Sequence, residues 1–444
     1  MSEQPKLERK ISLLQATAIN MTDMVGIGPF VVLSVVAETM QGPWFLYAWI
    51  AGAVLSFIDG MVWSQLGATY PLAGGSYNFL REGYGPRLGK LMSFLFVWQT
   101  MIQAPLVIAS AAIGFAQYSG YLIPLNEWQG KCISGSLVVA IVLLLYRKTE
   151  AIGKISVLLW VGVLVTMAWI IGGGVLHGRF LEPLKHINEG LTIDHAFAAA
   201  LGFASVKTVY SYLGYYNVCL LGGEIINPQK NIPRSMFISI AGIAVLYLAM
   251  NISVASVLPF DQIRQSRFVV SEFIQSLAGS AAARIATGLI LWVAFASVFS
   301  ATLGYSRIPY AAASDGAFFS VFAKLHPTKH FPHVSLLFLG AVAFVFSLLF
   351  KLRDVIDAIL AMRILVQFIG QGIGLLLLVK RKGRQHFAWR MPLYPLPVLL
   401  AIGIWGYIFF STGQKMMLGG LIVILLGLAA YLIKAKRNRE WPWG

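Results

Sequence analysis

Long apolar segments recur from residue 11 to residue 434, and they limit the possible fold more than any other feature of the sequence. Each segment has about 18 residues or more, which is the length that an α-helix needs to cross the hydrocarbon core of a bilayer. Charged residues make up only 12% of the 444 residues, about half of the fraction usual in soluble domains. The sequence therefore predicts an all-α integral membrane protein.

Twelve transmembrane helices are predicted, at about 11–39, 44–69, 88–118, 131–147, 155–176, 195–222, 235–258, 284–313, 334–350, 355–379, 394–411 and 417–434. Of the 34 Lys and Arg residues, 23 lie in loops on one side of these helices. Cytoplasmic loops carry such an excess. We therefore expect a multi-pass protein of the cytoplasmic membrane with both termini in the cytoplasm. The net charge of +16 is then explained by orientation, and no nucleic acid partner is expected.

Two of the predicted helices contain interruptions. The stretch NMTDMVGIGPFVV (20–32) places Gly26, Gly28 and a carboxylate, Asp23, within an apolar segment, and VKTVYSYLGYYNVCLLGGE (206–224) is interrupted by glycine. Helices 1–5 and 6–10 form two groups of five, so the second group enters the membrane from the opposite side. Breaks at corresponding places in two inverted halves indicate a transporter's binding site.

A broken helix leaves backbone N–H and C=O groups unpaired in a medium without water, at a cost of several kcal/mol per group. The amides of Gly26, Ile27 and Gly28, at the start of the outer half of helix 1, suit a carboxylate. The carbonyls around residues 22–24 and 210–213 suit an ammonium group. The breaks therefore predict a site for a zwitterion, and close packing of small residues is the alternative explanation for the glycines.

Four motifs resemble those of the amino acid–polyamine–organocation superfamily. They are MVGIGPF (24–30), WSQLGATYPLAGGSYNFLREGYG (63–85), YLGYYNVCLLGGEIINPQKNIPRS (212–235) and YSRIPYAAASDGAFFSVFAKLHP (305–327). Ile27 replaces the usual Ser of the first motif, and Gln65 replaces the usual Glu of the second. The form GGEIINPQKNIP is similar to bacterial members of the L-type amino acid transporter group.

The resemblance implies a five-plus-five inverted-repeat (LeuT-like) fold in which helices 1 and 6 are discontinuous. Residues 1–434 would form a single transporter domain. Its inverted repeats would cover about 11–176 and 195–379, with two additional helices at about 394–434. Residues 435–444 would form a short basic cytoplasmic tail.

Substrate-binding residues follow from the same resemblance, position by position. The substrate carboxylate would bind the backbone amides of Gly26, Ile27 and Gly28, and its amine would bind the carbonyls of Met24, Tyr210, Ser211 and Leu213. Tyr215 matches an aromatic gate that closes over the substrate from the external side. On helix 3, Gln99 and Gln103 share one face, and they would either line the pocket or tie helices together; we include Gln103 among the substrate-binding candidates.

Four ionisable residues lie at predicted membrane depth, where each costs a few kcal/mol in lipid. Asp23 would contact a substrate amine, a cation or a proton, or would cap the following half-helix. Arg363 on helix 10 would balance Asp23 or Asp59, and we expect structural pairing of Arg363 more than substrate contact. Asp59 is expected to be structural, and Lys207 to extend towards the membrane surface.

The coupling ion is left open by the sequence. Relatives that work without sodium often carry a Lys in helix 5, where this chain has Val163. Sodium-dependent relatives use helix-1 carbonyls and helix-8 hydroxyls, and Thr22, Ser297 and Ser300 would supply these groups. Asp23 and Arg363 are further candidates for ion or proton coupling. No cofactor is expected apart from Na⁺ or H⁺ as a coupling ion, and no metal site.

These features predict a secondary active transporter, a permease or exchanger that moves an amino acid by alternating access. A polyamine or other organic-amine transporter is the alternative. A channel is less favoured, and so is an intramembrane enzyme, because the sequence contains no HExxH or G-x-S-x-G motif. A monomer in the lipid bilayer is the expected functional unit.

Overall fold

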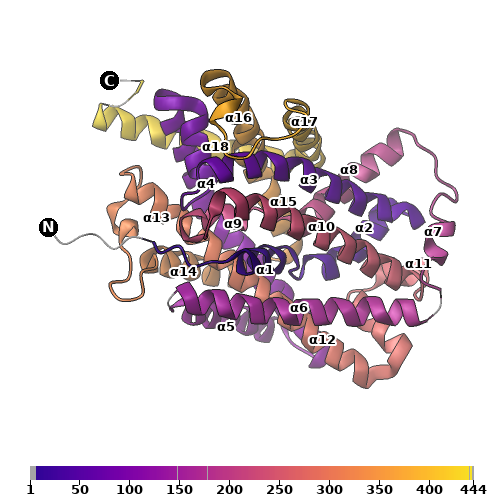
Figure 1. Cartoon of the computed structure of the whole chain (residues 1–444). Helices are drawn as coiled ribbons and strands as arrows, with labels where there is room; N and C mark the ends of the chain where they lie inside the picture. Colours follow the sequence, from indigo (N-terminus) through magenta and orange to yellow (C-terminus); the bar gives the residue numbers. More distant parts are fainter. Residues whose placement is uncertain (1–6, 148, 178, 440, 443–444) are drawn as a thin grey trace.

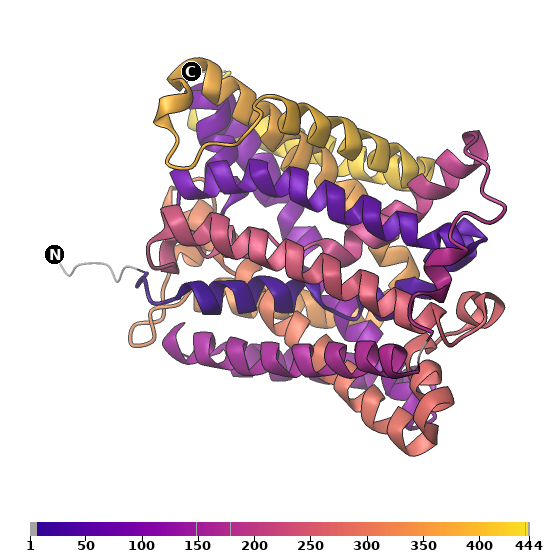
Figure 2. The same ribbon diagram turned by 45° about the vertical axis from the view of Figure 1, so that its right-hand side comes forward.

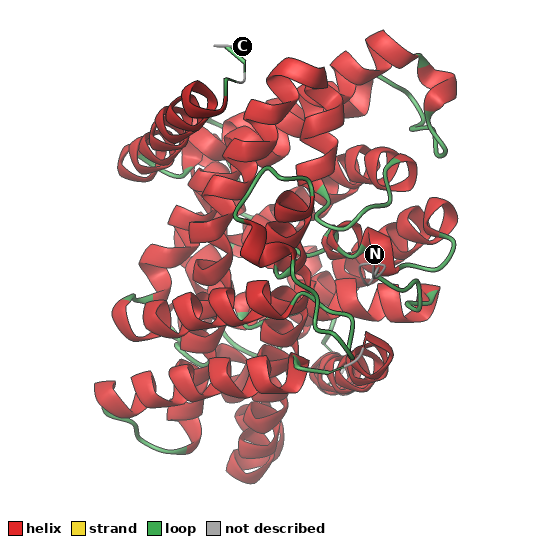
Figure 3. Ribbon diagram, turned by 90° about the vertical axis from the view of Figure 1, so that its left-hand side faces the viewer, coloured by secondary structure: helices red, strands yellow, loops and turns green. Residues whose placement is uncertain are grey.

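The computed structural model describes residues 7–147, 149–177, 179–439 and 441–442. Apart from two isolated β-bridges, the regular structure of these residues is entirely helical (Figure 3). Most of the long helices run roughly parallel or antiparallel to one another (Figures 1 and 2).

The first part of the chain forms α1 (Leu13–Met24), α2 (Gly28–Met40), α3 (Leu46–Thr69), α4 (Ser76–Leu122), α5 (Glu127–Leu145), α6 (Thr149–Leu176) and α7 (Glu182–Lys185). The middle part forms α8 (His195–Tyr212), α9 (Asn217–Leu220), α10 (Pro228–Ala255), α11 (Phe260–Gln265), α12 (Val269–Tyr305) and α13 (Arg307–Ser314). The last part forms α14 (His333–Leu349), α15 (Leu352–Arg363), the π-helix η4 (Ile364–Ile369), α16 (Gly370–Lys382), α17 (Leu396–Ser411) and α18 (Gln414–Asn438).

Within the described ranges, eight helices are long and apolar enough to cross a membrane, and the bent pair α1 and α2 counts as a ninth if it is one span. The apolar helices α14 and α17 fall short at 17 and 16 residues. All twelve predicted segments coincide with helices, and the all-α membrane class is confirmed. The number of twelve crossings stays a prediction.

The packing places α1 at the centre of the molecule. This helix contacts α6, α10 and α12, while α3 packs along α10 and α8. The α1 residues Ala16, Ala18 and Ile19 are at most 1% exposed. Met24 and Val25 are also at most 1% exposed, so the break at the end of α1 lies in the interior of the bundle.

A buried ion pair joins α13 to the segment after α9. Arg307 Nε and Nη2 donate to the two carboxylate oxygens of Glu224 at 2.8 and 3.1 Å, and both side chains are at most 2% exposed. Next to this pair, Ile11 forms a parallel β-bridge with Ile225. These contacts lie at the end of the bundle where the first described residues and the end of α18 are found (Figure 1). Both ends of the described chain are therefore on the same side.

Candidate functional site

The first break lies between α1 and α2, whose axes differ in direction by 42°. Val25 departs from helical geometry at φ −84° and ψ 75°, and the Gly26 amide donates to the Met24 carbonyl at 3.0 Å. Pro29, the second residue of α2, is compatible with this position because the first helical amides have no partner within the helix. The local sequence thus explains why α1 stops and α2 starts here.

The second break separates α8 from α9 and contacts the first. Its Gly214 has a φ of +121°, and a Cβ atom at this position would lie 2.8 Å from Met24 N and 2.9 Å from the Asp23 carbonyl carbon. Only glycine permits this approach of the two backbones. Tyr247 of α10 links the breaks, because its hydroxyl lies 2.6 Å from the Met24 carbonyl oxygen and 3.1 Å from that of Ser211. Sequence reasoning missed Tyr247, since one tyrosine in an apolar helix gives no signal.

A cavity of about 40 Å³ lies between the two breaks, which is room for about three water molecules. It is lined by Asp23, Met24, Gly26, Ile27, Gly28, Val107, Ala111, Tyr210, Ser211, Leu213, Gly214, Tyr216, Ser297, Ala301, Tyr305 and Arg363. Of these residues, Asp23 and Arg363 carry formal charges. Eight of the ten residues predicted to bind substrate are thus brought together.

The other two predicted residues lie outside this lining. Tyr215 turns away, and its hydroxyl donates to the Asp59 carboxylate. Tyr216 lines the cavity instead and stacks on Trp63, with ring centroids 4.6 Å apart. The two side chains diverge because residues 213–216 form a turn, in which neighbouring side chains point in different directions. The Asp59 carboxylate therefore has a hydroxyl partner, not Arg363.

Gln103 is buried one helical turn from Val107, which does line the cavity. Its Nε2 atom has no hydrogen-bond partner among the described residues. Gln99 lies one helical turn before Gln103 in α4, and neither of its polar side-chain atoms has a hydrogen-bond partner among the described residues. The two glutamines therefore extend a polar strip away from the cavity along one face of α4.

Arg363 ends α15, and a π-helix follows it directly. π-helical turns often occur at functional sites. The guanidinium lies over the rings of Tyr216 and Tyr305, 5.3 and 5.9 Å from their centroids, and Nε donates to Gln367 at 3.1 Å. Nη2 is buried without a partner in the part of the chain that the structure describes. A buried guanidinium with an unmet donor, on a residue that lines a cavity, is a candidate partner for an anionic group of a ligand.

The three hydroxyls predicted to bind sodium lie along α1 and α12. Ser297 Oγ lies 3.4 Å from the Asp23 carbonyl oxygen, and Ser300 Oγ donates to the Ile19 carbonyl at 2.7 Å. Thr22 is 1% exposed, and its hydroxyl has no partner among the residues described. Val163, at the position compared with the helix-5 Lys, is fully buried in α6.

Lys207 of α8 forms an ion pair with Asp357 of α15, which differs from the predicted extension towards the membrane surface. Asp357 precedes Arg363 by six residues, which is about 9 Å along a helix. The two side chains are 15% and 26% exposed. The pair therefore joins the same two helices that carry Tyr210 and Arg363 to the cavity, on the side that the basic loops predict as external.

Two broken helical segments around a charged cavity are features typical of membrane transporters. A sequence profile described as amino acid permease matches residues 11–430. The chain belongs to this family, which lies within the amino acid–polyamine–organocation superfamily. It is a transporter and not an enzyme.

Several curated proteins are similar over nearly the whole chain. The serine/threonine exchanger SteT of Bacillus subtilis (strain 168) is 26% identical over 434 residues, covering 96% of each chain. The branched-chain amino acid permease BcaP of the same organism is 23% identical, covering 99% of this chain and 96% of its own. The human cystine/glutamate transporter is also 23% identical, covering 99% and 88%.

Proposed function

We propose that this protein moves an amino acid with a short side chain across the cytoplasmic membrane by alternating access, with the substrate held between the two breaks. The observation that carries the proposal is that Asp23 and Arg363 line the same cavity. A carboxylate and a guanidinium on the same small cavity are complementary to the ammonium and carboxylate of a zwitterion. A polyamine carries only positive charge, so Arg363 disfavours the organic-amine alternative.

The orientation of the substrate follows from the backbone and these charges. The start of α2 directs the partial positive charge of Ile27 and Gly28 into the cavity, and we place the substrate carboxylate there, within reach of Arg363. The ammonium group then faces Asp23 and the carbonyls at the end of α8. The Gly26 amide is already bonded to Met24, so carboxylate binding by Gly26 requires that this turn opens.

The cavity of about 40 Å³ must widen to hold any amino acid, and the side chains that line it favour a short substrate side chain. Val107 and Ala111 of α4 and Ala301 of α12 are small, whereas Tyr216 and Tyr305 narrow the remaining space. The exchanger among the relatives is named for serine and threonine, which agrees with this size, although other relatives are named for larger substrates. We therefore choose L-serine as the first probe.

The twelve helices are interpreted as two inverted repeats, about 11–176 and 195–379, within one transporter domain of residues 1–434, with α17 and α18 added at about 394–434. In this interpretation α1 with α2, and α8 with α9, are the discontinuous helices 1 and 6. Both termini are placed in the cytoplasm, and a monomer is the working unit. Residues 435–444 are interpreted as a short basic cytoplasmic tail, of which residues 440, 443 and 444 lie outside the described ranges.

Exchange without sodium is the coupling mode that we infer. Sodium would need the α1 carbonyls and α12 hydroxyls as oxygen ligands. Ser300 instead donates to the Ile19 carbonyl at 2.7 Å, and Asn217 Nδ2 donates to the Ser300 carbonyl at 2.9 Å. A cation that used the Ser300 groups would have to break these hydrogen bonds, and Thr22 is the predicted hydroxyl that has no partner among the described residues.

Gly28→Leu tests the proposed position of the substrate. A Cβ atom at Gly28 would lie 3.1 Å from Ser211 Oγ and 3.3 Å from Tyr210 Cε1, so a larger side chain fills the carboxylate niche. We expect counterflow of L-serine in proteoliposomes to fall roughly 10- to 100-fold. Gly403→Leu on α17 is the matched control, because nothing lies within 4 Å of a Cβ atom there. If Gly28→Leu showed wild-type counterflow, the start of α2 would not be part of the substrate site.

A further inference from the structure

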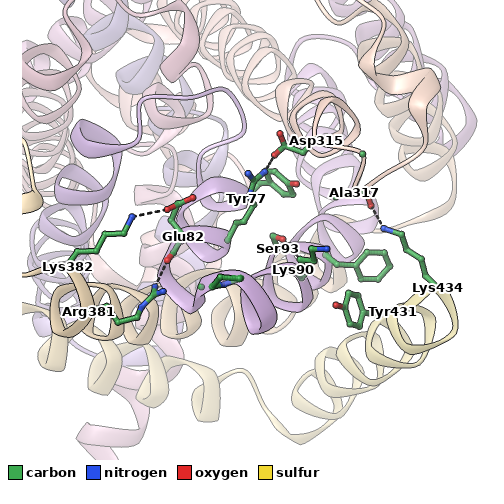
Figure 4. A pocket seen from close by; sticks show the side chains of 15 residues that line it. Tyr77, Glu82, Lys90, Ser93, Asp315, Ala317, Arg381, Lys382, Tyr431 and Lys434 are labelled. Atoms are coloured by element: carbon green, nitrogen blue, oxygen red, sulfur yellow. Dashed lines mark hydrogen bonds and ion pairs between the residues drawn. The ribbon is translucent and has the colours of Figure 1, made fainter. Parts of the chain in front are cut away.

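We propose that a second cavity, at the end of the bundle that contains Glu224 and Arg307, binds a phosphate group, that of an anionic phospholipid headgroup or of a soluble phosphate. It lies between α4, the loop after α13, and the ends of α16 and α18 (Figure 4). Its volume of about 570 Å³ falls in the range of known ligand sites, about 300–1,000 Å³. The proposal is independent of the transported substrate.

Positive charge dominates this cavity. Five cationic residues line it, namely Arg81, Lys90, Arg381, Lys382 and Lys434, against two acidic residues, Glu82 and Asp315. Both acids already contact a cation, since Arg81 pairs with Asp315 and Lys382 lies 3.2 Å from Glu82. The lining therefore carries a net charge of +3, which favours an anionic ligand with more than one acceptor oxygen.

Two of the cations are fixed by neutral groups. Arg381 Nη2 donates to the carbonyls of Glu82 and Gly83 at 2.5 and 2.6 Å, and Lys434 Nζ donates to the Ala317 carbonyl at 3.0 Å. These carbonyls orient the side chains towards the cavity, as Figure 4 shows for Lys434. They do not neutralise the charge. Phosphate oxygens form strong charge-assisted hydrogen bonds with such groups.

A helix start adds a further attraction for anions. Gly85, at φ +76°, interrupts α4, and Pro86 begins its second segment. Both residues line the cavity. The positive end of a helix of more than 30 residues therefore borders the same space as the cations. Phosphate groups bind at such helix starts in other proteins.

The surroundings favour a lipid as the source of the phosphate. Phe94 and Tyr431 form an aromatic side of the cavity, with ring centroids 5.5 Å apart. Along α18, Leu421, Leu425 and Ile433 are exposed and apolar, so this helix faces acyl chains. The positive loops predict this end as cytoplasmic, where the membrane surface is negatively charged. A headgroup in the cavity would thus continue directly into the bilayer.

Native mass spectrometry of the purified full-length protein tests the proposal by titration with phosphatidylglycerol and with phosphatidylcholine. The test variant is Lys90→Gln with Lys434→Gln, and the control is Arg87→Gln with Lys436→Gln, two exposed cations outside the lining. Both variants lose the same charge. We expect phosphatidylglycerol to bind about fivefold more weakly for each lysine removed in the test variant, and to bind the control as it binds the wild type.

A second measurement distinguishes the two sources of phosphate. The melting temperature is measured in detergent with and without inorganic phosphate. If phosphate raises the melting temperature of the wild type but not of the test variant, the ligand is a soluble phosphate. If the test variant loses only lipid binding, the ligand is a phospholipid headgroup. Equal lipid affinity in test and control, together with no effect of phosphate, would overturn the proposal. If the double variant does not fold, Lys90→Gln alone is compared with Arg87→Gln, since both side chains are exposed.

Discussion

At the scale of single residues, the site depends on which side chains have unmet hydrogen-bonding capacity. Arg363 Nη2 has no partner among the described residues although it is buried on the cavity. Leaving a buried charged donor unpaired is costly, and a proposed substrate carboxylate would satisfy it. We therefore propose that Arg363 contacts the substrate, whereas the sequence favoured a structural pair with an acidic residue.

Arg363→Gln follows as a test at this scale. Loss of a charge-assisted hydrogen bond, at about 1.5–3 kcal/mol, should raise the KM for L-serine counterflow roughly 10- to 100-fold. Arg284→Gln, an exposed cation of α12 outside the cavity, should leave the KM unchanged. If Arg363→Gln also kept the wild-type KM, the guanidinium would have no contact with the substrate.

Asp23→Asn is the complementary change. If Asp23 binds the substrate ammonium, the variant should lose affinity for L-serine by a similar factor, about 10- to 100-fold. Saturation of counterflow with increasing L-serine measures this affinity. Capping of α2 does not explain Asp23, because the N-cap of α2 is Ile27 and has no side-chain hydrogen bond. If the Asp23 charge does not contact the substrate, an asparagine of the same shape would replace it with little loss. Unchanged saturation would therefore return Asp23 to a structural role.

At the scale of elements, the ion pair between Lys207 and Asp357 holds α8 against α15 beside the cavity. This partly buried pair forms only while α8 and α15 are in contact, and their contact closes one side of the proposed site. In the proposed alternating access, opening on this side separates α8 from α15 and breaks the pair. Breaking the Lys207–Asp357 pair would therefore cost free energy when this side opens, and re-forming it would stabilise the closed state.

Lys207→Met should therefore shift the protein towards the state open on that side. We use a Cys132→Ser and Val107→Cys background, which removes the exposed native cysteine and places one on the cavity lining. In this background we expect alkylation by a membrane-impermeant thiol reagent to become about fivefold faster, which corresponds to about 1 kcal/mol. Lys185→Met, which removes an exposed pair with Glu182 in α7, is the control. Equal rates in the two variants would mean that the α8–α15 pair has no part in closing.

At the scale of the whole molecule, the cytoplasmic location of both termini is still a prediction. In Figure 1, α7 lies at the opposite end of the bundle from the end of α18. With Cys132 replaced by Ser, Lys185→Cys in α7 should react with an impermeant thiol reagent on intact cells. Lys436→Cys in α18 should react only after the cells are permeabilised. The reverse labelling pattern would contradict cytoplasmic termini.

The sequence alone determined the features that depend on local physical chemistry. Apolar segments long enough to cross a bilayer predicted the all-helical membrane class, and glycines with a carboxylate in such a segment predicted a break near Asp23. The motifs predicted the family. Eight of the predicted substrate-binding residues lie on one cavity because they belong to two short segments whose backbones are both interrupted.

Only the tertiary structure decided the features that depend on contacts between distant segments. Tyr215 and Tyr216 are neighbours in sequence, and the turn around Gly214 decides that Tyr216 lines the cavity while Tyr215 contacts Asp59. Lys207 and Asp357 are 150 residues apart, and no local pattern pairs them. The physical reason is that the length of an apolar segment fixes where a helix forms, whereas the directions of its side chains gain meaning only from the helices packed around it.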